Sequence, residues 1–108
     1  CALMSDIIFI YTTVSSKEEA LSIAQKLVDE GLIACANIND TMTSVYRWEN
    51  KVNIDSECSM ILKTSQTNKD KLQIRLNELH PYDCPCIAVI DINEINPAYE
   101  SWLLGELK

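Results

Sequence analysis

The side chains best suited to chemistry lie within one seven-residue segment, His80-Pro81-Tyr82-Asp83-Cys84-Pro85-Cys86. His80 is the only histidine of the chain, and Cys84 and Cys86 follow it closely. Imidazole nitrogen and thiolate sulfur are ligands that suit Cu(I) and Zn²⁺. Two cysteines that are two residues apart on an extended segment project to the same side. The segment therefore predicts a site for copper or a similar soft metal ion such as zinc, with His80, Cys84 and Cys86 as ligands.

The same three residues also have a structural interpretation. Cys86 would then begin a buried strand and pack as a small hydrophobic residue, Cys84 would be incidental, and His80 would cap the C-terminus of the preceding helix. Nucleophilic catalysis needs a thiol whose base is held by a third group, and nothing in the sequence identifies an oxyanion hole. Gly31 and Gly105 are the only glycines, and neither lies in a phosphate-binding motif. We therefore expect neither an enzyme nor an organic cofactor.

A second set of candidates could line a ligand cleft between subunits. It comprises Trp48, Glu57, Lys63 and Tyr82. Glu57 and Lys63 fall on the same face of an alternating strand pattern, and the aromatic side chains could form cleft walls. The simpler interpretation is that the aromatic residues pack in the core or at an interface, and that the charged face is solvated.

Composition and charge limit the possible partners. The chain has 108 residues, with 9 Lys and Arg against 16 Asp and Glu, which gives a formal net charge of −7. Such an acidic chain repels nucleic acid. No apolar run approaches the ~20 residues of a membrane helix, so no membrane partner is expected. Cysteines within strand-like patterns favour free thiols in a reducing compartment, and hence a cytoplasmic location. We expect residues 1–3 to be a cloning scar before a native start at Met4, and residues 4–108 to form a single domain.

The patterns along the chain predict seven elements. Residues 6–13 form an apolar strand, and a Ser16/Glu19 capping box begins a helix that ends at Gly31. Two long strand-like arms, residues 33–48 and 52–63, meet at a turn near Asn50. A helix from Thr67, a strand over residues 86–92 and a helix that begins at Pro97 follow. This order predicts an α+β fold, a ferredoxin-like βαββαβ sandwich with a long hairpin between the second and third strands and an extra C-terminal helix.

The predicted hairpin is too long for one compact domain. About 15 residues per arm at ~3.3 Å each span roughly 50 Å. A compact domain of this length has a radius of gyration of about 13 Å and is only about 34 Å across. An overhanging ribbon with an apolar face is unstable alone. The hairpin should therefore pack on another copy of the chain.

Several separated motifs occur in the order that is typical of one family. They are residues 34–38 (ACANI), 44–51 (SVYRWENK), 63–64 (KT), 80–82 (HPY) with Pro85, and 96–99 (NPAY) with Trp102. Together they resemble the CutA family of divalent-cation tolerance proteins. The resemblance implies a ferredoxin-like subunit in a tight homotrimer, whose long hairpins pack across subunits, and a link to copper and other divalent cations.

The chain also departs from the family's pattern. Tyr11 stands where bacterial members proposed to bind copper carry a cysteine, and Cys86 stands where the family usually has an acid. Only His80 matches that ligand set, while Cys84 and Cys86 offer a different and softer one. We expect a trimeric, non-enzymatic protein of metal homeostasis. The alternatives are a small-molecule signalling module with inter-subunit clefts, like the nitrogen-regulatory PII proteins, and a structural trimer that scaffolds partner proteins.

Overall fold

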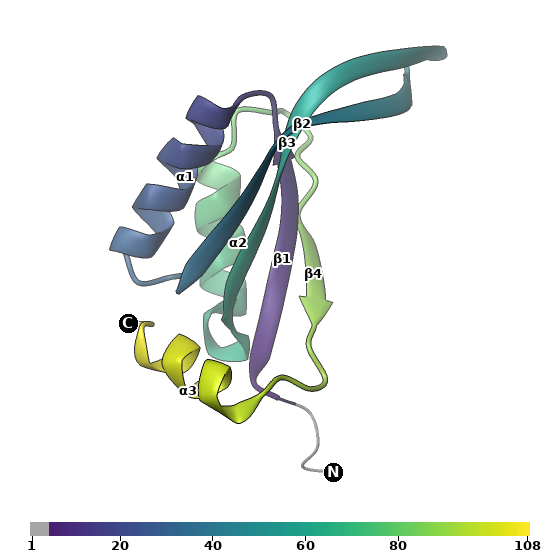
Figure 1. The fold of residues 1–108 in the computed structure, drawn as a ribbon. Coiled ribbons are helices and arrows are strands. Elements are labelled where there is room, and N and C mark those ends of the chain that lie inside the picture. The colour runs from purple at the N-terminus through teal and green to yellow at the C-terminus, as the bar shows by residue number, and fades with distance from the viewer. Residues whose placement is uncertain (1–4) are drawn as a thin grey trace.

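The computed structural model describes residues 5–108, so the expected cloning scar at residues 1–3 lies outside the described residues. Strands and helices alternate along the chain in the predicted order (Figure 1). They are β1 (Ile7–Val14), α1 (Lys17–Asp29), β2 (Cys35–Trp48), β3 (Lys51–Ser65), the short 3₁₀ helix η1 (Gln66–Asn68), α2 (Lys69–Leu79), β4 (Ala88–Asp91) and α3 (Pro97–Gly105).

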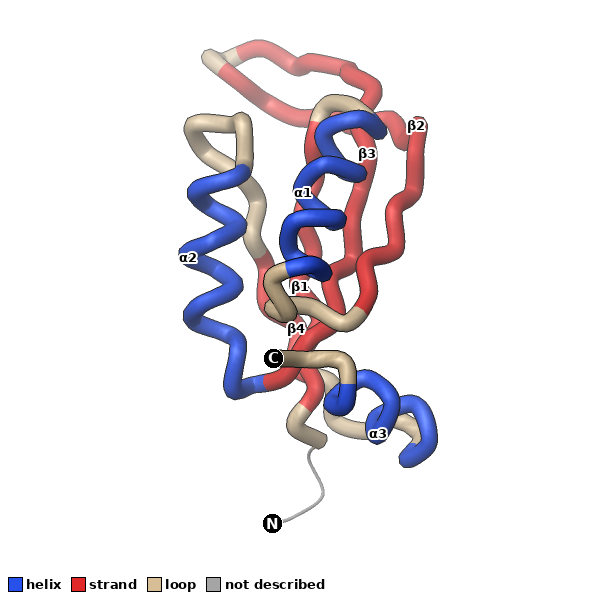
Figure 2. Tube along the Cα trace, turned by 90° about the vertical axis from the view of Figure 1, so that its left-hand side faces the viewer, coloured by secondary structure: helices blue, strands red, loops and turns tan. Residues whose placement is uncertain are grey.

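The strands form one antiparallel sheet in the order β2-β3-β1-β4. Helices α1 and α2 lie side by side on one face of this sheet, as the two perpendicular views show (Figures 1 and 2). The short α3 lies at the end of the sheet near the N-terminus of β1. This arrangement confirms the predicted α+β, ferredoxin-like fold with an additional C-terminal helix.

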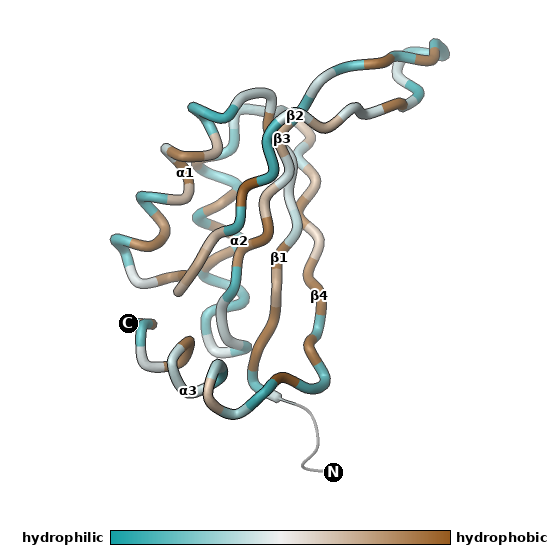
Figure 3. Tube along the Cα trace, in the orientation of Figure 1, coloured by the Kyte–Doolittle hydropathy of each residue, from teal (hydrophilic) through white to brown (hydrophobic). Residues whose placement is uncertain are grey.

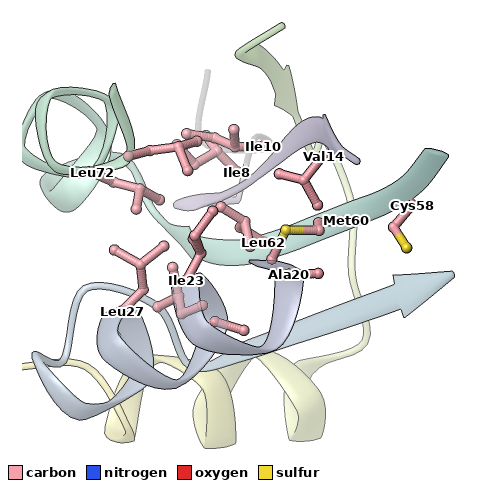
Figure 4. Close-up of a cluster of buried hydrophobic side chains, with 13 residues drawn as sticks. Ile8, Ile10, Val14, Ala20, Ile23, Leu27, Cys58, Met60, Leu62 and Leu72 are labelled. Atoms are coloured by element: carbon pink, nitrogen blue, oxygen red, sulfur yellow. The ribbon is translucent and has the colours of Figure 1, made fainter. Parts of the chain in front are cut away.

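The core lies between the sheet and its two helices. Alternate residues of β1 and β3 face the helices and are fully buried, while α1 and α2 contribute one apolar stripe each (Figure 4). The strands supply Ile8, Ile10, Val14, Cys58, Met60 and Leu62, and the helices supply Ala20, Ile23, Leu27, Leu72 and Leu76, among others. Burial of this two-layer core is the main source of stability for the fold.

Local signals explain where the helices begin. The hydroxyl of Ser16 accepts a hydrogen bond from the backbone N–H of Glu19 at 3.2 Å, as the predicted capping box requires. Helix α2 begins at Lys69, two residues after the expected start, because residues 66–68 form a 3₁₀ turn. The side chain of Asn68 is buried and lies 3.5 Å from the carbonyl oxygens of Gly31 and Leu32. It ties two loops together instead of capping the helix.

The long hairpin overhangs the domain, as its length predicted. The pairing of β2 with β3 shifts between Asn39 and Met42, where Thr41 has a φ of +63°. This bulge bends the distal hairpin over the helix-free side of the sheet (Figure 1). Glu49 and Asn50, with φ values of +50° and +64°, make the two-residue turn between Trp48 and Lys51. The largest extent of the molecule is 46 Å.

The apolar side chains of the distal hairpin are largely exposed in the single chain. Val45, Val52 and Ile54 are 65–69% exposed, and Trp48 is 60% exposed. Brown segments along this arm mark its apolar residues (Figure 3). The strand pattern therefore continues to the tip of the hairpin, but its apolar face has no partner within residues 5–108.

The last strand is shorter than predicted. Residues 88–91 pair with Ile8–Tyr11 of β1, whereas a strand was expected over residues 86–92. Cys86 lies before the strand and is exposed. The interpretation of Cys86 as a hydrophobic residue that begins a buried strand is therefore wrong for the single chain. No helix in the described part of the chain is long and apolar enough to cross a bilayer.

Candidate functional site

A pocket of about 460 Å³ lies beneath the bent hairpin, between the distal parts of β2 and β3 and the segment that precedes β4. Its walls combine three kinds of side chain. They are the aromatic residues Tyr46, Trp48 and Tyr82, the carboxylates Asp55, Glu57 and Asp83, and the thiols Cys84 and Cys86. Thr13 and Ser56 complete the lining. The bulge in β2 and β3 is what places hairpin residues opposite the segment of residues 82–86.

Glu57 joins the two sides of this pocket. Its carboxylate accepts hydrogen bonds from the hydroxyl of Ser44 at 2.6 Å and from the hydroxyl of Tyr82 at 2.8 Å. Burial raises the pKa of Tyr82 well above its usual value, and the hydrogen bond to Glu57 raises this pKa further. Across the pocket, the hydroxyl of Tyr46 donates to Asp55, and this bond raises the pKa of Tyr46.

His80 anchors the segment of residues 80–86, which leads from α2 to β4 and contributes to the pocket. Its Nε2 lies 2.8 Å from the carbonyl oxygen of Thr13, and its Nδ1 accepts a hydrogen bond from the backbone N–H of Tyr82 at 3.2 Å. Because a carbonyl oxygen can only accept, Nε2 is the donor of this hydrogen bond, and Nδ1 is the acceptor of the other. The ring is only 7% exposed and meets the Tyr82 ring edge-on, with centroids 4.9 Å apart. Both nitrogens are therefore occupied by contacts that hold the segment against β1.

Cys84 and Cys86 face the pocket with free thiols. Both residues are exposed and line the pocket, whereas Pro85 between them does not. This alternation agrees with the expected projection of the two cysteines to one side. Within residues 5–108, no group of three or more His, Cys, Asp and Glu side chains is arranged to hold a metal ion. The predicted metal ligands are thus a pair of accessible thiols beside a histidine that is already fully hydrogen-bonded.

The structure brings together three of the four predicted cleft residues. Trp48, Glu57 and Tyr82 line the pocket, but Lys63 does not. The Nζ of Lys63 donates to the hydroxyl of Tyr99 at 3.2 Å and lies 5.3 Å from the ring centroids of both Phe9 and Tyr99. Within one chain, Lys63 therefore connects the sheet to α3 and is separate from the pocket.

The four residues predicted for the cleft do not include Tyr46, Asp55 and Asp83, which also line the pocket. A two-residue turn at residues 49–50 sets the register Tyr46↔Asn53 and Ser44↔Asp55. The register could therefore have placed Tyr46 diagonally across from Asp55, and Ser44 diagonally across from Glu57. Nothing in the sequence indicated that the hairpin would bend over Asp83.

The pocket has a strongly negative electrostatic character. Three carboxylates line it, and no Lys or Arg among residues 5–108 does. The hydroxyls of Ser44, Tyr46 and Tyr82 satisfy hydrogen bonds but leave the carboxylate charges in place. Together with the net charge of −7, this arrangement attracts cations and repels anions.

Comparison with known proteins gives consistent matches over nearly the whole chain. The family model described as CutA1 divalent ion tolerance protein matches residues 8–106. The divalent-cation tolerance protein CutA of Pyrococcus horikoshii is 42% identical over 101 residues, which are 94% of this chain and 98% of that protein. The chloroplastic protein CutA of Arabidopsis thaliana is 38% identical over 89% of this chain and 53% of its own length.

Solved structures agree with these matches. The crystal structure of CutA1 from Pyrococcus horikoshii aligns with a TM-score of 0.90 and 40% identity over 94% of this chain and 98% of that chain. The periplasmic divalent cation tolerance protein CutA from Archaeoglobus fulgidus aligns with a TM-score of 0.89 and 32% identity, over 94% and 99% of the two chains.

Proposed function

Because the chain belongs to the family of CutA1 divalent ion tolerance proteins, we propose that it is a homotrimeric, non-enzymatic protein of metal homeostasis. In this proposal it binds copper or a similar metal ion at the pocket beneath the hairpin, in the segment of His80, Cys84 and Cys86. The observation that carries the proposal is that two free, exposed thiols share one pocket with three carboxylates and no basic side chain of the described chain.

Each part of the pocket has a physical role in this function. The carboxylates Asp55, Glu57 and Asp83 raise the local concentration of cations. Cys84 and Cys86 hold a soft ion by their sulfur atoms. His80 holds the segment in register with β1 through the carbonyl oxygen of Thr13. Free thiols also support a reducing compartment and hence the cytoplasm, because such thiols persist there.

Self-association is supported by the apolar surface of the distal hairpin. Val45, Val52 and Ile54 expose most of their side chains on the overhanging arm. Burying one such side chain contributes roughly 1.5–3 kcal/mol, so a second copy packed against this arm would gain substantially. The number of three subunits rests on the family resemblance.

A small-molecule signalling module remains the second candidate, because aromatic side chains line a pocket of suitable size. The negative lining and the separate position of Lys63 favour a cationic or neutral ligand over an anionic one. If Lys63→Ala abolishes binding of an anionic ligand and leaves metal uptake unchanged, the signalling candidate gains support. A trimeric scaffold predicts that the pocket binds no ligand.

Native mass spectrometry of the reduced protein tests the proposed function. The full chain is measured alone and with stoichiometric Cu(I) or Zn²⁺, beside a Cys84→Ser, Cys86→Ser double variant and a Cys35→Ser control on β2. We expect a trimer that takes up one ion per chain, with uptake lost in the double variant and kept in the control. A trimer that takes up no ion would refute metal binding, and a monomer would refute the assembly.

A further inference from the structure

We propose that Cys84 and Cys86 form a two-coordinate site for monovalent copper, Cu(I), in which the two thiolates are the only protein ligands. This inference rests on the proposed metal-binding function and names its ion and its coordination. It differs from the sequence prediction because it assigns His80 a positioning role and no bond to the metal.

The two sulfur atoms are the accessible soft donors of the pocket. Both cysteines line the same cavity, and both are free and exposed. Pro85 separates them and does not line the cavity, and its fixed φ stiffens the segment between the two thiols. An ion in the pocket therefore meets two soft donors from one short and restrained piece of backbone.

Other donors nearby are less available to a soft ion. His80 and Glu57 are already engaged, and Asp55 and Asp83, which also line the pocket, offer hard carboxylate oxygens. The two nitrogens of His80 bond to the Thr13 carbonyl oxygen at 2.8 Å and the Tyr82 N–H at 3.2 Å. The two carboxylate oxygens of Glu57 accept from Ser44 and Tyr82. Recruiting either residue as a third ligand would break buried or half-buried hydrogen bonds, each of which contributes about 0.5–3 kcal/mol.

Ion preference follows from this donor count. Structural Zn²⁺ is almost always four-coordinate, and hard divalent ions such as Mg²⁺ take six oxygen ligands. Thiolate is a soft ligand that suits both Cu(I) and Zn²⁺, and the filled d shell of Cu(I) accommodates two ligands in a line. A pair of thiolates without a third protein ligand therefore satisfies Cu(I) and leaves Zn²⁺ with half of its coordination open.

The binding step balances without a change of oxidation state. Two S–H bonds break, two Cu–S bonds form, and two protons leave to solvent, so that the two thiolates and one Cu(I) carry a net charge of −1. No oxidant or reductant takes part, because the ion arrives and stays as Cu(I). The carboxylates of Asp55, Glu57 and Asp83, which line the same pocket, form and break no bonds in this step.

The test measures Cu(I) binding by competition with a chromophoric Cu(I) chelator, without oxygen, on the full chain in a Cys1→Ser, Cys35→Ser background. We expect one Cu(I) per chain and two sulfur neighbours by X-ray absorption. Cys84→Ser or Cys86→Ser should weaken binding by at least the ~10–100-fold that loss of a supporting residue costs in metal sites. His80→Gln, whose amide can still donate to the Thr13 carbonyl oxygen, should keep two sulfur neighbours and lose no nitrogen neighbour by X-ray absorption, because the imidazole is not a ligand.

The outcomes separate this inference from the proposed function. Three or more sulfur neighbours, a nitrogen neighbour lost in His80→Gln, or Zn²⁺ that competes equally with Cu(I) would overturn the two-coordinate site. Uptake of Zn²⁺ alone, lost in the cysteine variants, would overturn it while the metal-binding function stands. If neither ion binds, both fail.

Discussion

Replacing Glu57 with glutamine should weaken the contact that joins the hairpin to the pocket segment. The carboxylate of Glu57 accepts from Ser44 at 2.6 Å and from Tyr82 at 2.8 Å. Hydrogen bonds to a charged group contribute about 1.5–3 kcal/mol, against about 0.5–1.5 kcal/mol for neutral pairs. An amide has one accepting oxygen and one donating NH₂ group, so it can accept only one of these two bonds, and without the charge. Since Glu57 is only half-buried, we expect Glu57→Gln to lower the free energy of unfolding by about 1–2 kcal/mol.

The same substitution should change the alkaline behaviour of the protein. The folded state holds the pKa of Tyr82 above the unfolded value, first through burial and then through Glu57. A raised folded pKa contributes stability that is complete below the unfolded pKa, near 10, and that is lost as the pH rises from there towards the folded value. Without the Glu57 charge, the folded pKa falls and this contribution shrinks.

Two measurements check both effects at fixed protein concentration. Urea unfolding at neutral pH gives the free-energy change, and tyrosinate absorbance between pH 9 and 13 gives the titration, with Tyr82→Phe identifying the signal of Tyr82. Glu94→Gln, at an exposed site outside the pocket lining, is the matched control. If the tyrosinate titration of Glu57→Gln matches that of the control, the hydrogen bond to Glu57 does not raise the pKa of Tyr82. The described link between the hairpin and residues 82–86 is then wrong.

Three further predictions concern assembly, capping and the core. Ile54→Lys on the exposed hairpin face should lower the average mass in sedimentation, whereas Ile74→Lys, equally exposed on α2, should not; equal behaviour would exclude the hairpin as the interface. Ser16→Ala removes the cap of α1 and should cost about 1 kcal/mol in chemical unfolding, so an unchanged midpoint would mean that the cap contributes nothing. Leu62→Ala in the core should cost about 2–5 kcal/mol, while Leu21→Ala at a 40% exposed site should cost far less, and similar losses would contradict the assigned core.

Much of the fold could be predicted because its signals are local. A hydroxyl at residue 16 and a glycine at residue 31, which adopts a φ of +75°, delimit α1 in the sequence and in the structure. The start of α2 could not be placed as well. Thr67 and Asp70 suggested a cap, but the side chain of Asn68 binds to the loop at Gly31 and Leu32, a contact between segments far apart in sequence.

The site was only partly predictable because alternation along a strand gives the face of a residue and not its distance from others. Glu57 and Lys63 share a face of β3, but six residues separate them, which is about 20 Å at ~3.3 Å per residue. The bend lies near Glu57, so Glu57 faces the pocket while Lys63 contacts Tyr99 of α3. A left-handed backbone at Thr41 is rare for a β-branched residue, and no sequence pattern indicated it.

That single bend would connect the proposed assembly to the pocket. Tyr46 and Trp48 lie on the overhanging arm and also form walls of the pocket. A second copy that packs against the arm must therefore alter the surroundings of the pocket, and a bound ion must alter the arm. Two equilibria that share residues are coupled, and the coupling is reciprocal. The factor by which self-association changes the affinity for the ion equals the factor by which the ion changes the self-association constant. Because Trp48 comes from the hairpin, and Cys84 and Cys86 come from the segment before β4, this coupling would act through the width of the pocket.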